Sequence, residues 1–194
     1  MIVKGKYIII SGVGPGLGTK LAVHAALEGA AGIAIGGLEP EKIVETRDAA
    51  REALKMSHAV LPQMRKQKEG AIVMICTMGT KMVPLVDQAG YNASKAALFN
   101  ATRALAKGVG KDNIRVNSLH PGFMWGKPVI AALPVFAANW GGEEAAKAKI
   151  IAHNALPRIV TDDEAARAGL FLASDYASGI TGATLDVNGG AFMP

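Results

Sequence analysis

The chain has 194 residues, of which 50% are hydrophobic and 19% are charged, and its formal net charge is +5. This length suffices for one domain with a sizeable core, and the composition is that of a globular chain. The positive charge is spread along the chain, so we expect no nucleic-acid partner. A single cysteine excludes an internal disulfide framework, and no apolar run reaches the roughly 20 residues of a membrane span. We therefore expect a cytoplasmic protein without a membrane segment, in which residues 1–194 form one domain.

The N-terminal segment has the pattern strand, glycine-rich turn, helix. Residues 7–11 form a short β-branched run, and residues 19–29 have a helical pattern. Between them lies Gly-Val-Gly-Pro-Gly-Leu-Gly at positions 12–18. Glycines let a backbone approach a phosphate closely, and the helix N-terminus that follows offers unpaired N–H groups. In this context the stretch predicts a dinucleotide-binding turn rather than an ordinary loop.

A second buried strand is expected at residues 32–35 and completes a βαβ unit. An acidic side chain at the end of this strand usually selects NAD, and a basic one usually selects NADP. This chain has Gly36 and Gly37 there, which carry no charge. The choice between the two cofactors therefore stays open.

The rest of the chain alternates helices and strands. A helical pattern covers residues 41–67, and Pro62 should kink it or break it locally. The other expected elements are a strand at 71–77, a loop at 78–90, a helix from Tyr91 to Lys107, a strand at 114–119, an irregular segment at 123–142, helices at 143–152 and 162–173, and a strand and turn at 182–190. This alternation predicts a parallel sheet with helices on both faces.

Tyr91 and Lys95 stand four residues apart at the start of the third long helix. Side chains at this spacing lie on the same helix face. A phenol has an ordinary pKa of about 10, and a neighbouring cation lowers that pKa because it favours the phenolate. The pair is therefore a candidate acid/base group near neutral pH. The same pattern is also typical of a surface tyrosine beside a solvated lysine.

Four stretches, taken together and in order, resemble the short-chain dehydrogenase/reductase family. Residues 11–18 match its glycine-rich loop, with serine in place of threonine, and Tyr91 and Lys95 match its Tyr-x-x-x-Lys pair. Arg-Val-Asn and His-Pro-Gly within 115–122 match the segment after the catalytic helix, and Asp-Val-Asn-Gly-Gly at 186–190 matches the closing strand. The resemblance implies an α/β fold of the Rossmann-like three-layer αβα type, with a mostly parallel sheet.

The resemblance also implies hydride transfer between NAD(P) and a carbonyl or secondary alcohol. Tyr91 would exchange a proton with the substrate oxygen, and Lys95 would hold the nicotinamide ribose and lower the pKa of Tyr91. Thr77 corresponds to the family's helper serine, and Thr80 is the second choice because the spacing from Thr77 to Tyr91 is one residue longer than usual. The residues expected to contact the cofactor are Gly12, Gly14, Pro15, Gly16, Leu17, Gly18, Gly37, Tyr91, Lys95, Pro121, Gly122 and Phe123.

Residues 123–160 correspond to the region that covers the substrate in this family. Their aromatic side chains favour a bulky apolar substrate and equally favour a core or subunit contact; they are Phe123, Trp125, Phe136 and Trp140. The four histidines have no metal-ligand spacing, so we expect no metal. The helices at 41–67 and 91–107 correspond to the family's dimerisation faces, which implies a homo-oligomer, a dimer or a tetramer.

The chain departs from the family pattern in its interior. After Gly37 it lacks a helix and about two strands, including the strand that carries Asn-Asn-Ala-Gly. The helix that follows has no Asn in the window 46–49, and Gly126 replaces the threonine after Pro-Gly. Without the missing strand, the two halves of the sheet must pair directly or leave edges unpaired. The alternative functions are therefore an impaired scaffold that serves as a binding or oligomer-forming subunit, or another α/β fold with a different nucleotide.

Overall fold

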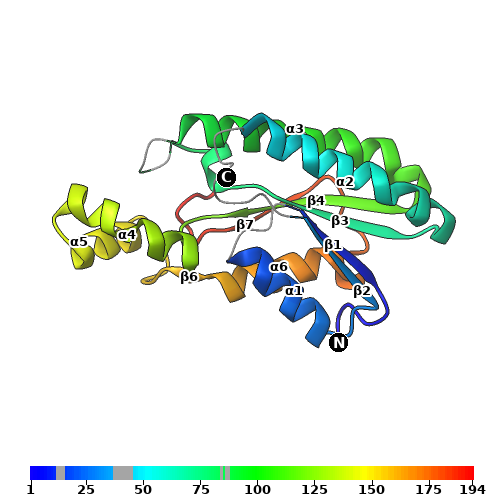
Figure 1. Cartoon of the computed structure of the whole chain (residues 1–194), viewed down its shortest axis with the longest axis horizontal. Coiled ribbons are helices and arrows are strands. Elements are labelled where there is room, and N and C mark those ends of the chain that lie inside the picture. The colour runs from blue at the N-terminus through cyan, green and yellow to red at the C-terminus, as the bar shows by residue number, and fades with distance from the viewer. Residues whose placement is uncertain (12–15, 37–45, 84, 86–87) are drawn as a thin grey trace.

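Helices cover both faces of the strands in this computed structural model (Figure 1). Helices α2 (Thr46–Gln67) and α3 (Ala89–Val109) lie on one face, and α1 (Leu17–Leu27) and α6 (Asp162–Ala173) lie on the other. The expected αβα arrangement is therefore confirmed. The structure describes residues 1–11, 16–36, 46–83, 85 and 88–194.

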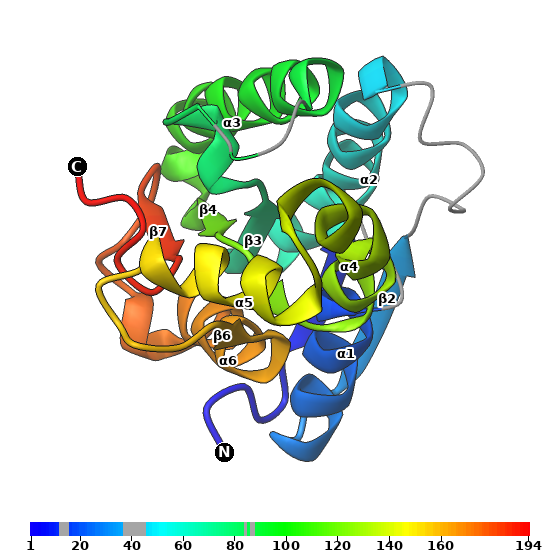
Figure 2. The same ribbon diagram turned by 90° about the vertical axis from the view of Figure 1, so that its left-hand side faces the viewer.

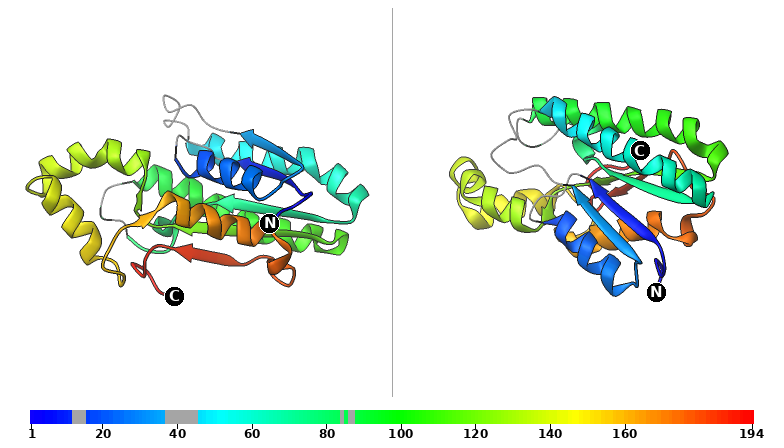
Figure 3. Two further views of the ribbon diagram at one scale, coloured as in Figure 1. Left: turned by 90° about the horizontal axis from the view of Figure 1, so that it is seen from below. Right: turned by 45° about the vertical axis from the view of Figure 1, so that its right-hand side comes forward.

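The strands form three parallel ladders within the described residues. β1 (Tyr7–Ser11) pairs with β2 (Gly32–Gly36). The central ladder has the order β3-β4-β7, and its strands are β3 (Gly70–Ile75), β4 (Ile114–Pro121) and β7 (Thr184–Val187). A short ladder joins β5 (Met124–Trp125) to β6 (Val160–Thr161). Figure 3 shows β7 and the β1–β2 pair on opposite sides of β3 and β4.

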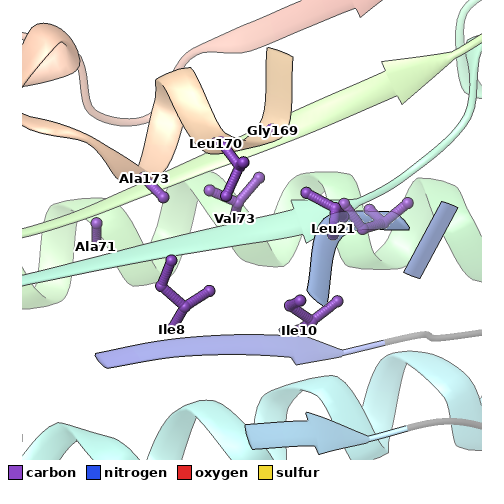
Figure 4. A pocket seen from close by; sticks show the side chains of 9 residues that line it. Ile8, Ile10, Leu21, Ala71, Val73, Gly169, Leu170 and Ala173 are labelled. Carbon is purple, nitrogen blue, oxygen red and sulfur yellow. The ribbon is translucent and has the colours of Figure 1, made fainter. Parts of the chain in front are cut away.

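The two larger ladders meet at a boundary between β1 and β3. No ladder of backbone hydrogen bonds joins these strands within the described part of the chain. Apolar side chains of both strands and of the helices α1 and α6 meet at this boundary, among them Ile8, Ile10 and Val73 (Figure 4). They leave an apolar cavity of about 20 Å³. Of the two arrangements expected for a sheet that lacks its connecting strand, the structure has the one with unpaired facing edges.

Two apolar layers hold the sandwich together. The first lies between the strands and the helices α1 and α6, and contains Ile10, Leu21, Leu119 and Leu170. The second lies beneath α2 and α3, and contains Leu61, Met74, Leu98 and Val116. Each layer buries a helix stripe against β-branched strands, which is the main favourable contribution to folding.

A third helical unit projects from one end of the sandwich (Figure 1), and Figure 2 shows this unit end-on, in front of the strands. It consists of α4 (Lys127–Trp140) and α5 (Glu143–Ala152). The expectation of an irregular segment at 123–142 was wrong. Pro128 stands at the helix start, where proline is tolerated because the missing N–H has no partner there anyway. Pro134 lies inside the helix without ending it.

The remaining boundaries follow the sequence pattern closely. Helix α2 passes through Pro62 without the expected break, and residues 41–45 of its predicted range lie outside the described residues. Helix α6 begins at the expected cap, because Thr161 and Glu164 form a reciprocal capping box. The 3₁₀ turn η2 (Met78–Thr80) occupies the first part of the expected loop. Among the described residues, no helix has both the length and the apolar character needed to cross a membrane.

Candidate active site at the carboxyl ends of β3 and β4

Thr77 caps the turn that follows β3. Its Oγ1 accepts a hydrogen bond from the Gly79 N–H at 3.3 Å, and its backbone carbonyl accepts one from Thr80 Oγ1 at 2.9 Å. The Thr80 hydroxyl also contacts His120 Nδ1 at 3.1 Å, so it is engaged within the fold. No residue of the described part accepts a hydrogen bond from the Thr77 hydroxyl. Of the two candidate helper residues, Thr77 therefore has the freer hydroxyl.

Tyr91 and Lys95 lie in the first two turns of α3. The Lys95 Nζ is 5.8 Å from the centroid of the Tyr91 ring, so the expected shared face is observed. The same Nζ donates a hydrogen bond to the Ile75 carbonyl at 2.7 Å. This contact directs the Lys95 ammonium towards the end of β3, the strand that leads to Thr77. Tyr91 lies beside Lys95 on the same face of α3.

The expected lowering of the Tyr91 pKa is not observed. Burial of the phenol, with a smaller contribution from the negative charge of the Cys76 thiolate, raises the pKa of Tyr91 to about 12, although 37% of the residue surface is exposed. Burial also lowers the pKa of Lys95 and raises that of Cys76 to about 11. The physical reason is that desolvation disfavours each charged form, while the Lys95 ammonium is bonded to a carbonyl of β3. Tyr91 is consequently a protonated phenol at neutral pH.

Part of the expected cofactor-binding turn can be placed. Gly16 precedes α1, and a Cβ there would come within 3.0 Å of the Pro128 side chain, so α4 packs closely on this point. Leu17 and Gly18 are buried in the first turn of α1. The other expected members of this turn, which are Gly12, Gly14, Pro15 and Gly37, lie outside the described residues.

Pro121 and Gly122 end β4 beside the closing strand. Pro121 pairs with Val187, and the Gly122 N–H donates a hydrogen bond to the Val187 carbonyl at 3.1 Å. A Cβ on Gly122 would lie 2.8 Å from the Cβ and 2.9 Å from the Cα of Asn188. Glycine is therefore required here by the close approach of the closing turn.

We expect Gly122→Ala to lower the free energy of unfolding by roughly 1–3 kcal/mol, as overpacking commonly does. The reason is that the backbone of Asn188 would have to move away from the new methyl group. Urea denaturation followed by circular dichroism measures the change. Gly108→Ala in α3 is the control, because a Cβ there meets no atom within 4 Å. Equal stability of the two variants would contradict the steric explanation.

The aromatic residues after Gly122 pack mainly on one another. Phe123 meets Phe136 edge-on, with 6.1 Å between ring centroids, and Phe136 stacks on Trp140 at 5.1 Å. Trp125 packs against the same cluster, beneath α4 and α5. These contacts make the aromatics the core of the projecting unit, which is one of the two interpretations that the sequence left open. Phe123 therefore points into this core.

A polar cluster beside Thr77 was missed from the sequence. His120 is fully buried and lies between the hydroxyls of Thr80 and Ser118, each 3.1 Å away. Next to it, Lys81 Nζ contacts both carboxylate oxygens of Asp186 at 2.6 and 2.9 Å. Only the parallel register, in which His120 is opposite Asp186, brings these residues together. The described residues contain no group of three or more His, Cys, Asp or Glu side chains that could hold a metal ion.

His120 should make stability depend on pH. Burial, with the Lys81 charge second, lowers the pKa of His120 to about 4, while Asp186 raises it and Arg103 lowers it slightly. Between about pH 6.5 and pH 4 the His120 imidazole is therefore protonated in the unfolded chain and neutral in the folded chain. The free energy of unfolding consequently falls as the pH falls through this range. We expect a loss of about 2 kcal/mol from pH 7 to pH 4.5 that is absent in His120→Asn. Urea denaturation at both pH values measures it, and an equal loss in both proteins would contradict the assignment.

Part of this sequence is similar to the sequences of known proteins. The family model described as enoyl-(acyl carrier protein) reductase matches residues 49–191. Acetoacetyl-CoA reductase of Shinella zoogloeoides is 36% identical over 138 residues, which cover 71% of this chain and 53% of that protein. The 3-oxoacyl-(acyl carrier protein) reductase of Pseudomonas aeruginosa is 37% identical over 139 residues, covering 72% and 52%. A 3alpha-hydroxysteroid dehydrogenase of Mediterraneibacter gnavus is 33% identical over 153 residues, covering 79% and 57%.

Solved structures show the same fold at lower sequence identity. A dehalogenation enzyme superposes with a TM-score of 0.80 at 22% identity, covering 99% of this chain and all of that one. A short-chain dehydrogenase/reductase from Burkholderia xenovorans gives 0.76 at 23% identity, with 97% of each chain covered. The chain belongs to the short-chain dehydrogenase/reductase family. It spans about half the length of the curated relatives that it matches.

Proposed function

We propose that the protein is an NAD(P)-dependent oxidoreductase that transfers a hydride between the nicotinamide and a carbonyl or secondary alcohol. The observation that carries this proposal is the gathering of Tyr91, Lys95 and Thr77 where β3 ends and α3 begins. The family supports it, because its reductases act on C=O and CH–OH groups. We further propose a cytoplasmic homo-oligomer, as the family resemblance implies.

The environment of Lys95 fits a bound dinucleotide. Its ammonium is largely buried and donates one hydrogen bond, to the Ile75 carbonyl. No carboxylate within the described residues pairs with it. An ammonium has three donors, so two remain for the hydroxyl groups of a ribose. Lys95 would therefore hold the nicotinamide ribose, and the reduced cofactor would supply the hydride.

Tyr91 would supply the proton in the direction of carbonyl reduction. Its phenol is protonated at neutral pH, as an ordinary phenol is, and burial raises its pKa further, to about 12. It can therefore donate to the substrate oxygen as negative charge develops there, while the free Thr77 hydroxyl donates a second hydrogen bond to the same atom. In the reverse direction the alcohol proton would return to Tyr91.

The direct test is the oxidation of NADH or NADPH in the presence of carbonyl substrates. The names of the relatives suggest a panel of acetoacetyl-CoA, a longer 3-oxoacyl thioester and a 3-ketosteroid. We expect turnover with at least one pairing. No turnover by a folded protein with any pairing would contradict the proposal and favour the impaired scaffold, for which the unpaired facing edges of β1 and β3 are the supporting observation.

A further inference from the structure

Asn92 has an unsatisfied buried atom at the candidate site. It follows Tyr91 directly in the first turn of α3. Its Oδ1 is buried, and no residue of the described part donates a hydrogen bond to it. Such an atom gives up its hydration on folding without a replacement, so its presence requires an explanation.

The Asn92 amide lies against the turn that carries Thr77. A Cβ on Gly79 would lie 2.3 Å from Oδ1, 2.9 Å from Cγ and 3.1 Å from Nδ2 of Asn92. A hydrogen of the Gly79 α-carbon therefore faces Oδ1 and can act as a weak donor. The N–H of the same glycine makes the long 3.3 Å bond to Thr77 Oγ1. Asn92 thus contacts Gly79, the residue whose N–H is bonded to the Thr77 hydroxyl.

The opposite side of this turn is fixed by satisfied polar contacts. Thr80 contacts His120 on β4, and Lys81 is paired with Asp186 on β7. These contacts set the position of the turn relative to the central strands. On the side of α3, which also bonds to the end of β3 through Lys95, the Asn92 amide lies against Gly79 of this turn.

We propose that Asn92 is a positioning residue that sets the Thr77 hydroxyl relative to Tyr91. This role rests on the proposed function, since it matters only where both hydroxyls address one substrate oxygen. A leucine has the same branched shape, with a larger volume, and carries no acceptor that burial leaves unsatisfied; such a replacement is neutral or stabilising when only packing matters. The structure therefore predicts opposite effects of Asn92→Leu on stability and on catalysis.

The test compares three variants in steady-state carbonyl reduction and in urea denaturation. Asn92→Leu should lower kcat by about tenfold to a hundredfold, because small misplacements of reacting groups have effects of this size, with KM unchanged and the urea midpoint unchanged or higher. Gly79→Ala should lower kcat in the same way, since its Cβ displaces the amide. Asn100→Leu, on an exposed position of the same helix, should change neither. A kcat in Asn92→Leu equal to that of the wild type would overturn the proposal.

A structural measurement that does not depend on enzyme activity separates this proposal from the proposed function. Absence of turnover in the wild-type protein would refute the proposed function. In that case, crystal structures of the wild type and of Asn92→Leu decide the positioning role. The proposal requires that the Thr77 hydroxyl moves relative to that of Tyr91 by more than about 0.5 Å, the tolerance of a working site. An unmoved hydroxyl would overturn it.

Discussion

Replacement of Tyr91 by phenylalanine is expected to lower kcat for carbonyl reduction by roughly 10²–10⁴-fold, the usual contribution of a positioned acid. The ring keeps its packing beside Lys95, but the proton donor is lost. The affinity for reduced cofactor should change little, because Lys95 and the Tyr91 ring, which are both expected to contact the cofactor, are retained in this variant. Single-turnover rates and nicotinamide fluorescence measure the two quantities separately.

Tyr176→Phe provides the matched control for this experiment. Tyr176 is 76% exposed and lies in a 3₁₀ turn after α6, between Asp175 and Ala177. Its replacement should leave kcat unchanged. If Tyr91→Phe retained the wild-type rate, or if both variants lost the same fraction of activity, Tyr91 would not be the acid.

Replacement of Asn117, which lies on β4 and is 1% exposed, is expected to have a large effect on the free energy of unfolding. Its Nδ2 donates to the Ile180 carbonyl at 2.8 Å, and its Oδ1 accepts from the Ala183 N–H at 3.0 Å. Asn117→Leu removes both bonds and leaves the half-buried Ala183 N–H without its partner. We expect a loss of about 2–4 kcal/mol in the free energy of unfolding, from the typical cost of unsatisfied buried groups.

Urea denaturation measures the loss, with Asn100→Leu as the control on the exposed face of α3. The neighbouring Arg115 supports the same segment, since its guanidinium donates to the carbonyls of Leu172, Ser174 and Ile180. The effect of Asn117→Leu should therefore appear as lower stability of a protein that still folds. A loss equal to that of Asn100→Leu would contradict the assigned role of the amide.

Elements with local signals could be predicted from the sequence. Helix α6 begins where Thr161 and Glu164 predict a cap, and the shared face of Tyr91 and Lys95 follows from helical spacing alone. Helix α4 was not predicted, although it spans Lys127–Trp140 and contains Pro128 at its start and Pro134 in its interior. A proline at a helix start removes no hydrogen bond, so its presence did not exclude a helix.

The parts of the site that could not be predicted depend on contacts between distant segments. The expected direction of the Tyr91 pKa shift was wrong because burial of the phenol, which depends on how distant segments pack around α3, raises this pKa. The pair of Lys81 and Asp186 forms across 105 positions, through a strand register that no local pattern encodes. The contact between Asn92 and Gly79 likewise needs the turn and α3 to be placed in space.

We propose that this shortened chain still forms a nicotinamide site around Lys95. The most direct test titrates the protein into NADH and, separately, into NADPH, and follows the nicotinamide fluorescence, with Lys95→Ala as the control. We expect saturable binding of at least one cofactor that weakens in the variant, and the cofactor that binds more tightly is the one that the Gly36-Gly37 segment accepts. No saturable binding of either cofactor by the folded wild-type protein would contradict the account.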